Sequence, residues 1–539
     1  MKLHKDIAPF WVGGDSMPPR KSQVEAMNWM VEHKKAKYLI LEMPVGSGKS
    51  LLGMTFSRYR GNSSFALTPQ IILQKQYEND FETDKTLKLS SFYGKSNYQC
   101  YEKGVSCAAG SLIKPRCQSC PYLDARKFAQ NANNTVMNYT LGLSVWSYTN
   151  MYKSEDGSPK TRNLTILDEA HKVEHHLVQF DTVIINENWC LENNISIPKS
   201  TEMSDIIEFI RDKYNEALIN AYEQINAELE FIKETKNTRG ASSKEMKKTK
   251  ELNFLESQIT VCHGILKLDV EDVEKDYVLI TSPQGIELKR LYGKRSFKTI
   301  MDPMSKQMLF MSSTILNKDD FCRDLGINPK EAEFLSLESE FDAENRPVLY
   351  MPRMKMNYGW NKPENAADRK EMLATIKKIC DMNEGESGVI HSGNFAVAEW
   401  LCEELNIGGT HEIIQHNPSS KIKRNDAIQD FIETSTPSVL ISPSSTEGLD
   451  LKDDLARFAI FVKVPFGNMG DAWIKKRMQI SSEWYQRQAM IEVIQGGGRI
   501  VRTPDDWGTT FILDGSFGYL YQQNKHKVPK WWKSAYQQI

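Results

Sequence analysis

The chain lacks any apolar run long enough to cross a membrane, and its first residues do not predict the leader of a secreted protein. A membrane-spanning helix needs about 20 predominantly apolar residues, and no stretch approaches that length. The amino-terminal segment MKLHKDIAPFWVGG has no apolar h-region, so no signal peptide is expected. We therefore expect an intracellular, cytoplasmic protein with no membrane partner.

Cysteine is scarce, with nine residues in the whole chain, and this scarcity excludes a disulfide framework. Five cysteines are scattered singly and are expected to be small buried side chains: Cys190, Cys262, Cys322, Cys380 and Cys402. The other four fall within one short segment: Cys100, Cys107, Cys117 and Cys120. This second group is a candidate metal site.

A large net charge, internal repeats and long low-complexity linkers are also absent. The formal charge of −2 gives no global indication of nucleic-acid binding, so any such site must come from local basic surface. Hydrophobic residues make up 40% and charged residues 26%, which is typical of a globular protein. A length of 539 residues predicts about three to four domains.

The segment KYLILEMPVGSGKS has the order of strand and glycine-rich loop that a phosphate-binding loop needs, and the helical LLGMTFSRYR follows it. Gly46 and Gly48 would let backbone amides approach the phosphates. Lys49 would reach the β and γ oxygens, and the Ser50 hydroxyl would bind Mg²⁺. Met43 stands where the strict pattern has its first glycine, so the segment alone is also compatible with an ordinary loop.

A DEAH sequence follows the strand-like run NLTIL farther along the chain. This order places two carboxylates at the end of a strand. Asp168 would hold the magnesium shell, and Glu169 would orient or deprotonate the attacking water. The alternative is a solvent-exposed acidic turn, but such a turn fits poorly with the apolar residues that directly precede the DEAH sequence. The two motifs in this order predict an NTPase.

A third motif, QGGGRIVR, follows the helical segment SSEWYQRQAMIEVI near the carboxyl terminus. Arg499 and Arg502 are three residues apart, so they share one helical face and could point together at a γ-phosphate. An arginine in that position contributes about 10³–10⁵ in rate. An isolated pair would more often be a solvated face, but together with Gln495 the pair forms a frame that is typical of helicases.

With these motifs in order, the sequence resembles the XPD/DinG group of superfamily 2 DNA helicases along most of its length. LEMPVGSGKS is close to the family's phosphate-binding loop, including its Met-Pro, so Met43 fits the family pattern. PPRKSQVEAM, with Arg20 and Gln23, resembles the adenine-reading Q-motif. ALTPQIILQKQ resembles motif Ia, and MSSTIL resembles motif III, although Ser313 stands where alanine is usual.

Two later segments extend the resemblance: STEGLD is similar to motif V, and QGGGRIVRTPDDWG is similar to motif VI. The resemblance implies that ATP binds between two lobes, with Gln495, Arg499 and Arg502 approaching from the second. The ATP-binding residues that it implies are Arg20, Gln23, Met43, Pro44, Val45, Gly46, Ser47, Gly48, Lys49, Ser50, Glu447, Gly448 and Asp450.

The clustered cysteines could hold Zn²⁺ or an iron–sulfur cluster as four thiolates. The cysteine ligands of structural zinc usually come as two pairs, each closely spaced in sequence. Here only Cys117 and Cys120 form such a pair. The flanking segments YGKSNYQC and CPYLDARKFAQNANNTVMNYTLG are similar to the edges of the family's iron–sulfur domain. The resemblance favours a [4Fe–4S] cluster, with zinc as the alternative and metal-free structural cysteines third.

The cysteine module is locally basic, with six Lys/Arg and two acidic residues between Tyr93 and Lys127. Tyrosines interleave with these cations, and positive charge with aromatic rings is how proteins hold single strands. Solvated lysines and core tyrosines would give the same pattern. The candidate DNA-binding residues are Thr68, Gln76, Tyr98, Tyr101, Lys103, Arg116, Tyr122 and Ser392.

Apolar residues recur at three- and four-residue intervals over 207–232 and again over 252–266, which predicts an antiparallel pair of amphipathic helices. The segment between Lys233 and Lys250 carries seven basic and two acidic residues. By resemblance this hairpin is the family's Arch insertion, and a solvated tip is the alternative reading. A strand near 276–280 is expected to return the chain to the first lobe.

We therefore predict an α/β protein with two RecA-like parallel-sheet lobes. The first lobe takes residues 1–92, 141–175 and 276–320, and the second takes 321–539. A cluster module (93–140) and a helical Arch-like insertion (176–275) interrupt the first lobe.

The predicted function is that of a monomeric ATP-dependent DNA helicase that uses Mg²⁺. The resemblance implies 5′ to 3′ movement on single-stranded DNA, action at duplex/single-strand junctions, and a role in repair or replication. A DEAH-type RNA helicase is one alternative. An ATP-driven nucleoprotein remodeller or binding platform without strand separation is the other.

Overall fold

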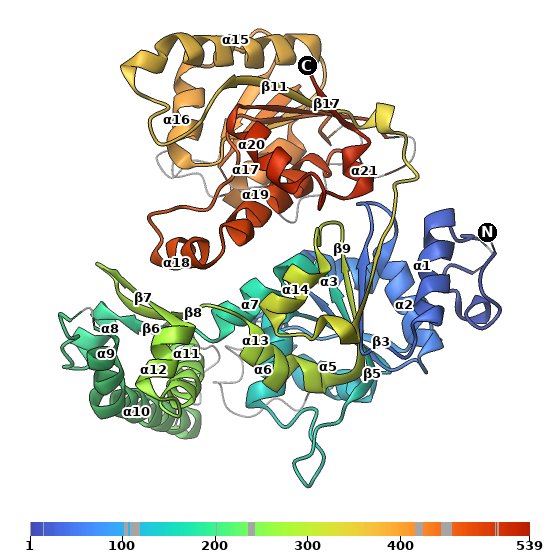
Figure 1. Cartoon of the computed structure of the whole chain (residues 1–539). Coiled ribbons are helices and arrows are strands. Elements are labelled where there is room, and N and C mark those ends of the chain that lie inside the picture. The colour runs from blue at the N-terminus through green and yellow to red at the C-terminus, as the bar shows by residue number, and fades with distance from the viewer. Residues whose placement is uncertain are drawn as a thin grey trace.

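In the computed structural model, two parallel-sheet lobes stack on each other and an insertion projects beside the first lobe (Figure 1). The structure describes residues 2–14, 16–101, 106–107, 119–200, 202–235, 243–415, 424–443, 455–501, 503 and 506–539. Each lobe is an α/β unit on a seven-stranded parallel sheet, which confirms the predicted fold class of two RecA-like lobes.

The first lobe is built on strands in the order β10-β1-β9-β5-β2-β4-β3. Side chains of β1 alternate between two hydrophobic clusters, with Tyr38 and Ile40 in one and Leu39 and Leu41 in the other. Because both faces are covered, β1 is buried throughout, as its continuous apolar run predicts. The strands are β1 (Tyr38–Glu42), β2 (Ser64–Thr68), β3 (Leu89–Ser91), β4 (Asn134–Asn138), β5 (Arg162–Asp168), β9 (Ser305–Ser312) and β10 (Ala332–Ser336).

The connections after these strands gather at the carboxyl edge of the sheet, where ligands bind in open α/β folds. The phosphate-binding loop follows β1 and the DEAH box follows β5, and only β9 separates those two strands. The two motifs therefore lie about 10 Å apart along the sheet. The helices of this lobe include α1 (Lys21–Glu32), α2 (Lys49–Tyr59), α3 (Ile71–Phe81), α5 (Pro121–Asn131), α6 (Tyr139–Tyr148) and α7 (Val173–Phe180).

The first sheet extends farther along the chain than the sequence predicts. β10 pairs in parallel with β1, with Tyr38 opposite Ala332, although the second lobe is expected from residue 321. The reason is that α14 (Lys318–Leu325) packs Phe321 and Leu325 into the core of the first lobe. β10 then covers the edge of β1, which would otherwise present unpaired backbone groups.

The insertion contains its own antiparallel sheet, β6-β8-β7, together with the predicted hairpin of long helices. β7 (Tyr277–Ser282) pairs with β8 (Gly285–Arg290) and β8 with β6 (Val183–Asn186), so the strand expected to return to the first lobe belongs to the insertion instead. The hairpin consists of α10 (Asn215–Thr235) and α11 (Ser243–Ile265), flanked by α8 (Glu187–Glu192), α9 (Met203–Phe209) and α12 (Val270–Asp276). Within the described residues, neither these nor any other helix is both long and apolar enough to span a membrane.

The second lobe repeats the parallel architecture with the strand order β13-β14-β12-β15-β16-β11-β17. Its strands are β11 (Val348–Met354), β12 (Gly388–His391), β13 (Glu412–Gln415), β14 (Ser438–Ser442), β15 (Phe458–Phe461), β16 (Thr509–Asp514) and β17 (Tyr536–Gln538). Its helices include α15 (Ala366–Met382), α16 (Phe395–Glu404), α17 (Arg424–Glu433), α18 (Ala472–Ile480), α19 (Ser482–Gly497), α20 (Ser516–Asn524) and α21 (Lys530–Lys533). Of these, α18 and α19 face the first lobe.

Candidate active site between the two lobes

The phosphate-binding loop joins β1 to α2, and both of its glycines adopt left-handed backbone conformations. Gly46 has φ of 73° and Gly48 has φ of 76°, which side-chain-bearing residues rarely adopt. The Lys49 ammonium donates to the carbonyl oxygens of Pro44 at 3.2 Å and of Met43 at 3.5 Å. The loop thus holds its own lysine at the start of α2, as a phosphate-binding loop requires.

Arg20 and Gln23, at the start of α1, contact this loop directly. The Arg20 guanidinium donates to the Gly46 carbonyl at 2.8 Å, and Gln23 Nε2 donates to the Ser47 carbonyl at 3.0 Å. A Cβ on Gly48 would lie 2.5 Å from that same Gln23 nitrogen, so the contact also depends on glycine. The two residues that the sequence assigns to adenine recognition therefore support the loop in this structure.

Asp168 and Glu169 lie at the carboxyl end of β5 and face the loop. Burial, and after it the charge of Glu169, raises the pKa of Asp168 to about 6, while the Lys49 ammonium acts in the opposite direction. Glu169 has φ of 49°, an uncommon conformation for a residue with a side chain. Such strained positions concentrate at functional sites. The structure therefore brings Lys49, Asp168 and Glu169 into one electrostatic group.

Two buried tyrosines hold the DEAH aspartate, and no sequence motif indicated them. The Tyr77 hydroxyl lies 3.3 Å from Asp168 Oδ2 and is also hydrogen-bonded to the Ser50 side chain. The Tyr139 hydroxyl donates to the Asp168 carbonyl at 2.7 Å. Burial raises the pKa of both phenols, so they remain neutral. Tyr77 thereby joins the two residues that the sequence predicts as Mg²⁺ ligands, Ser50 and Asp168.

Helix α19 of the second lobe delivers Gln495 to the first lobe. Gln495 Nε2 donates to Ser313 Oγ at 2.9 Å and to Thr314 Oγ1 at 2.6 Å, and it lies 3.5 Å from His171 Nδ1. The same His171 nitrogen is 2.8 Å from Ser312 Oγ. A chain of hydrogen bonds therefore connects three predicted motifs, DEAH, III and VI, across the boundary between the lobes.

Arg499 follows the end of α19, and its turn lies opposite the phosphate-binding loop. A Cβ on Gly498 would lie 3.4 Å from Val45 Cγ2 of that loop. Burial, and after it the charge of Arg499, lowers the pKa of His391 to about 4, so that ring is neutral beside the arginine. The remaining predicted residues of motifs V and VI lie outside the described part of the chain: Glu447, Gly448, Asp450 and Arg502.

A groove of about 450 Å³ runs where the two lobes meet. Gln70, which follows β2, and His175 of α7 line it from the first lobe, and Tyr485 of α19 lines it from the second. An ion pair between Lys172 Nζ and Glu492 at 3.0 Å joins the two walls. Polar and aromatic groups of both lobes therefore face one channel beside the nucleotide motifs.

The predicted DNA-contacting residues of the two lobes have different environments. Thr68 and Ser392 are fully buried, and their hydroxyls donate to the carbonyls of Gln70 at 3.0 Å and Asn394 at 3.1 Å. The ends of β2 and β12 therefore enclose these two side chains. A residue that contacts DNA would instead lie on the surface. Gln76 is exposed on α3. Two further candidates lie outside the described residues: Lys103 and Arg116.

The tyrosines of the cysteine module also include both packed and exposed side chains. The rings of Tyr98 and Tyr122 pack edge to face at 5.8 Å, and Tyr122 also packs against Phe92 at 5.5 Å. Lys95 lies over the Tyr122 ring at 5.5 Å. Tyr101, by contrast, is 73% exposed. Two of the three tyrosines therefore belong to a local core, and Tyr101 is open to a stacking partner.

Three of the clustered cysteines fall within the described residues, and Cys117 lies outside them. Cys107 Sγ and Cys120 Sγ are 3.4 Å apart. Burial, and after it Cys120, raises the pKa of Cys107 to about 11, and Cys100 contributes in the same direction. Cys107 and Cys120 are therefore neighbours, and Cys100 is close enough to act on the charge of Cys107. In the described part of the chain, however, no set of three or more potential ligands forms a metal-binding group. The predicted cluster remains a prediction.

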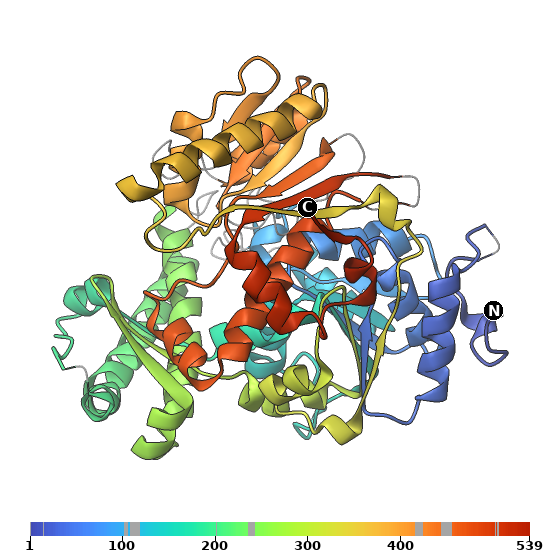
Figure 2. The same ribbon diagram turned by 45° about the horizontal axis from the view of Figure 1, so that its top comes forward.

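Helix α18 of the second lobe lies beside the insertion (Figure 2), and it carries a buried cation that pairs with residues of the first lobe. Arg477 is 2% exposed, and its guanidinium lies 2.7 Å from Glu174 and 3.6 Å from Asp324. The same group lies 4.4 Å from the ring centres of Tyr292 and Trp484. No motif indicated Arg477, because its partners are distant in sequence.

Sequence comparisons find helicase relatives for both lobes. Residues 376–535 match the helicase C-terminal domain family, and residues 16–191 match the type III restriction enzyme res subunit family. The ATP-dependent DNA helicase YoaA of Escherichia coli (strain K12) is 23% identical over 74% of this chain and 67% of its own length. YoaA of Haemophilus influenzae is 24% identical over 92% and 91%. DinG of Photobacterium profundum is 28% identical over 45% of this chain, but the match spans only 35% of that protein.

Solved structures show the same fold. An XPD helicase superposes with a TM-score of 0.63 at 13% identity, covering 97% of this chain and 100% of that one. Xpd4 of S. tokodaii gives a TM-score of 0.56 at 13% identity, over 96% and 100%. Sequence matches in both lobes and a shared two-lobe fold therefore agree, and together they support an XPD/DinG-like superfamily 2 ATP-dependent helicase.

Proposed function

We propose that the chain is an ATP-dependent DNA helicase that moves 5′ to 3′ along one strand and separates duplex DNA at single-strand junctions during repair or replication. The observation that carries this proposal is the chain of hydrogen bonds from Gln495 through Thr314, Ser313 and His171, because it makes the contact between the lobes part of the nucleotide site. We infer the preference for DNA from the similarity to YoaA and DinG, which are named ATP-dependent DNA helicases. Such a substrate implies an intracellular protein.

The first lobe would bind ATP and position the water that attacks it. The Lys49 ammonium would exchange its bonds to the loop carbonyls for the β and γ oxygens. Ser50 and Asp168 supply the hard oxygen ligands that Mg²⁺ prefers, and Tyr77 already joins them. Bound Mg²⁺ would neutralise charge on the phosphates. Glu169 would orient the water, with His171 beside it, since His171 Nδ1 lies 3.5 Å from Glu169 Oε2.

The second lobe would sense the γ-phosphate through the turn after α19. Arg499, with Arg502, would approach that phosphate from the side opposite Lys49. When hydrolysis removes the phosphate, the two lobes lose a shared ligand and separate. Contacts across the boundary, such as the pair between Lys172 and Glu492, would then break and re-form. A strand lying in the groove between the lobes would be released by one lobe and held by the other.

The substitution Glu169→Gln tests the hydrolytic role. We expect this variant to bind ATP normally and to lose about 10²-fold or more in turnover, because a positioned base contributes at least that much. Glu187→Gln is a matched control, since Glu187 is an exposed residue at the start of α8 and should keep full turnover. Near-normal hydrolysis by Glu169→Gln would remove that residue from the role.

We propose a [4Fe–4S] cluster on Cys100, Cys107, Cys117 and Cys120. The approach of Cys107 Sγ to Cys120 Sγ supports it, because thiolates are the ligands of such clusters. Protein purified without oxygen should show broad visible absorbance together with iron and acid-labile sulfide. Zinc without iron would contradict the cluster. Cys117→Ser should abolish unwinding while leaving some DNA-stimulated hydrolysis, and Cys402→Ser, outside the module, should keep the metal.

An RNA remodeller is the main rival, and stimulation of ATP hydrolysis separates the two. Single-stranded DNA should raise the rate more than RNA of the same sequence does. Stronger stimulation by RNA would favour the rival.

A further inference from the structure

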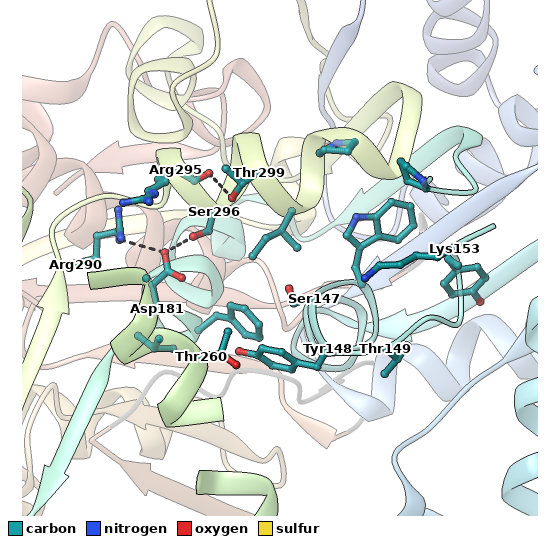
Figure 3. A pocket seen from close by; sticks show the side chains of 18 of the residues that line it. Ser147, Tyr148, Thr149, Lys153, Asp181, Thr260, Arg290, Arg295, Ser296 and Thr299 are labelled. Atoms are coloured by element: carbon teal, nitrogen blue, oxygen red, sulfur yellow. Dashed lines mark hydrogen bonds and ion pairs between the residues drawn. The ribbon is translucent and has the colours of Figure 1, made fainter. Parts of the chain in front are cut away.

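A second cavity, of about 520 Å³, lies at the base of the insertion and takes no part in the proposed motor (Figure 3). It is lined by the end of α6 and the loop before β5, by residues 295–303 before β9, and by α11 of the insertion. Segments that precede parallel strands lie at the amino edge of a sheet, whereas the phosphate-binding loop and the DEAH box lie at its carboxyl edge. β5 has 7 residues, so about 20 Å separates the cavity from the nucleotide motifs.

The walls of this cavity are aromatic. Tyr148 and Phe180 stack with ring centroids 5.4 Å apart, and Trp146 stacks with Tyr152 at 6.2 Å. All four line the cavity. The planar faces of these side chains favour packing against a planar ring of a ligand. The volume of the cavity falls within the roughly 300–1,000 Å³ that small-molecule sites occupy.

The charged groups of the cavity leave an excess of positive charge. Asp181 is already occupied, because its carboxylate lies 3.1 Å from Arg290 Nε and accepts a hydrogen bond from Ser296. Arg295 and Lys153 line the cavity on opposite sides, as Figure 3 shows. Neither makes an ion pair with any residue that the structure describes. Two cations are therefore available to an anionic ligand.

Ser147 adds a hydrogen-bonding group between these two cations (Figure 3). Its Oγ is buried and has no hydrogen-bond partner among the described residues. Buried polar groups are nearly always paired in native proteins, so an orphaned hydroxyl on a cavity wall indicates a place where a ligand atom fits.

We propose that this cavity binds a nucleoside monophosphate. The planar base would lie against the aromatic wall, and Ser147 Oγ would hydrogen-bond to the ligand. Arg295 would take the phosphate, because a guanidinium binds two phosphate oxygens at once, and Lys153 would meet acceptor atoms at the far end. Since α11 forms one wall and the first lobe the other, the bound nucleotide would connect the insertion to the motor.

Binding calorimetry tests this proposal. The intact protein is first saturated with a non-hydrolysable ATP analogue and Mg²⁺, so that the motor site is occupied. AMP, GMP, CMP and UMP are then titrated separately, with adenosine, guanosine and inorganic phosphate as partial ligands. At least one monophosphate should bind with a stoichiometry of one, and should bind about tenfold or more tightly than phosphate alone or its own nucleoside.

Two variants locate the site. A Cβ on Gly264 of α11 meets nothing within 4 Å, so Gly264→Trp would fill the cavity without a backbone clash. Gly264→Trp and Arg295→Glu should each weaken binding by about tenfold or more, because they remove space and the phosphate partner respectively. Gly264→Ala and Lys298→Glu, an exposed position nearby, should leave it unchanged.

Three results would overturn the proposal: no saturable binding by any of the four monophosphates, phosphate alone binding as tightly, or unchanged affinity in Gly264→Trp. ATP hydrolysis by these variants, measured without added monophosphate, should match the wild type, which keeps this test separate from that of the motor.

Discussion

Burial keeps His176 neutral on the wall of the groove between the lobes. It lowers the pKa of His176 to about 4, and the neighbouring His175 and Lys172 act in the same direction. The ring also packs against Tyr139 at 5.0 Å, which ties it to the DEAH aspartate. In the unfolded chain the same imidazole would titrate near 6.5. Because the folded state holds the proton less tightly, stability is fully present above about pH 6.5 and falls as the pH drops toward 4.

We therefore predict that His176→Phe reduces the acid sensitivity of the fold. Between pH 7 and pH 5 the wild type should lose about 2 kcal/mol more of its unfolding free energy than the variant does. Denaturant unfolding at the two pH values measures this difference. His526→Phe replaces an exposed histidine and serves as the control. The same pH dependence in wild type and His176→Phe would contradict the assignment.

Residues of the site could be predicted from the sequence where their motif is local. Lys49 and Glu169 stand in short patterns whose strand and loop order is visible along the chain. Tyr77 could not be predicted, because it meets Asp168 across 91 residues of sequence. The same holds for Arg477, whose partner Glu174 is 303 residues away. Contacts of this kind depend on how the lobes pack, and a single sequence does not reveal that.

At the scale of elements, α18 acts as a brace between the lobes. Arg477 is enclosed by aromatic rings and paired with Glu174, and the Trp473 indole donates to the Arg290 carbonyl of β8 at 2.7 Å. Burial raises the pKa of Glu174 to about 7, although Arg477 acts in the opposite direction. Removing the arginine would leave that carboxyl buried without its cation.

We predict that Arg477→Met destabilises the closed arrangement by about 3–5 kcal/mol, the usual cost of removing one partner from a buried ion pair. Thermal unfolding and limited proteolysis of the insertion measure the effect. Lys476→Ala removes an exposed cation from the same helix and should change little. If both variants unfold at the wild-type temperature, α18 is not a brace.

Two helical glycines give opposite predictions for the same substitution. A Cβ on Gly264 in α11 meets open space, so Gly264→Ala should stabilise the protein by about 0.5 kcal/mol through helix propensity. A Cβ on Gly142 in α6 would lie 2.9 Å from buried Leu67, so Gly142→Ala should cost about 1–3 kcal/mol. Unfolding free energies measure both, and equal signs would contradict the packing described for these helices.

Helices and strands could be predicted where their apolar residues recur at a regular spacing and where the fold class dictates which elements they pack against. The hairpin of α10 and α11 lies where the recurring apolar residues of 207–232 and 252–266 predict it. β7 was predicted as a strand but assigned to the wrong sheet, because an apolar run does not say which neighbour it pairs with. β10 was missed, because its pairing with β1 is set by the packing of α14 beneath it.

At the scale of the whole molecule, two parallel-sheet lobes meet along the nucleotide motifs, and the insertion is tied to both. Gln495 joins the lobes at the site, the pair of Lys172 and Glu492 joins them beside the groove, and Arg477 joins them at the insertion. Hydrolysis at the first contact would therefore act on the other two. In the proposed function, this coupling would convert ATP hydrolysis into movement along a strand.

We propose that this coupling separates DNA strands. The most direct measurement is strand separation of a labelled DNA duplex that carries a single-stranded tail at one end, with 5′-tailed, 3′-tailed and blunt versions compared. We predict ATP-dependent separation of the 5′-tailed duplex by the wild type, and none by Glu169→Gln. Separation from 3′ tails alone would contradict the proposed polarity. ATP hydrolysis that never separates any tailed duplex would contradict the account as a whole.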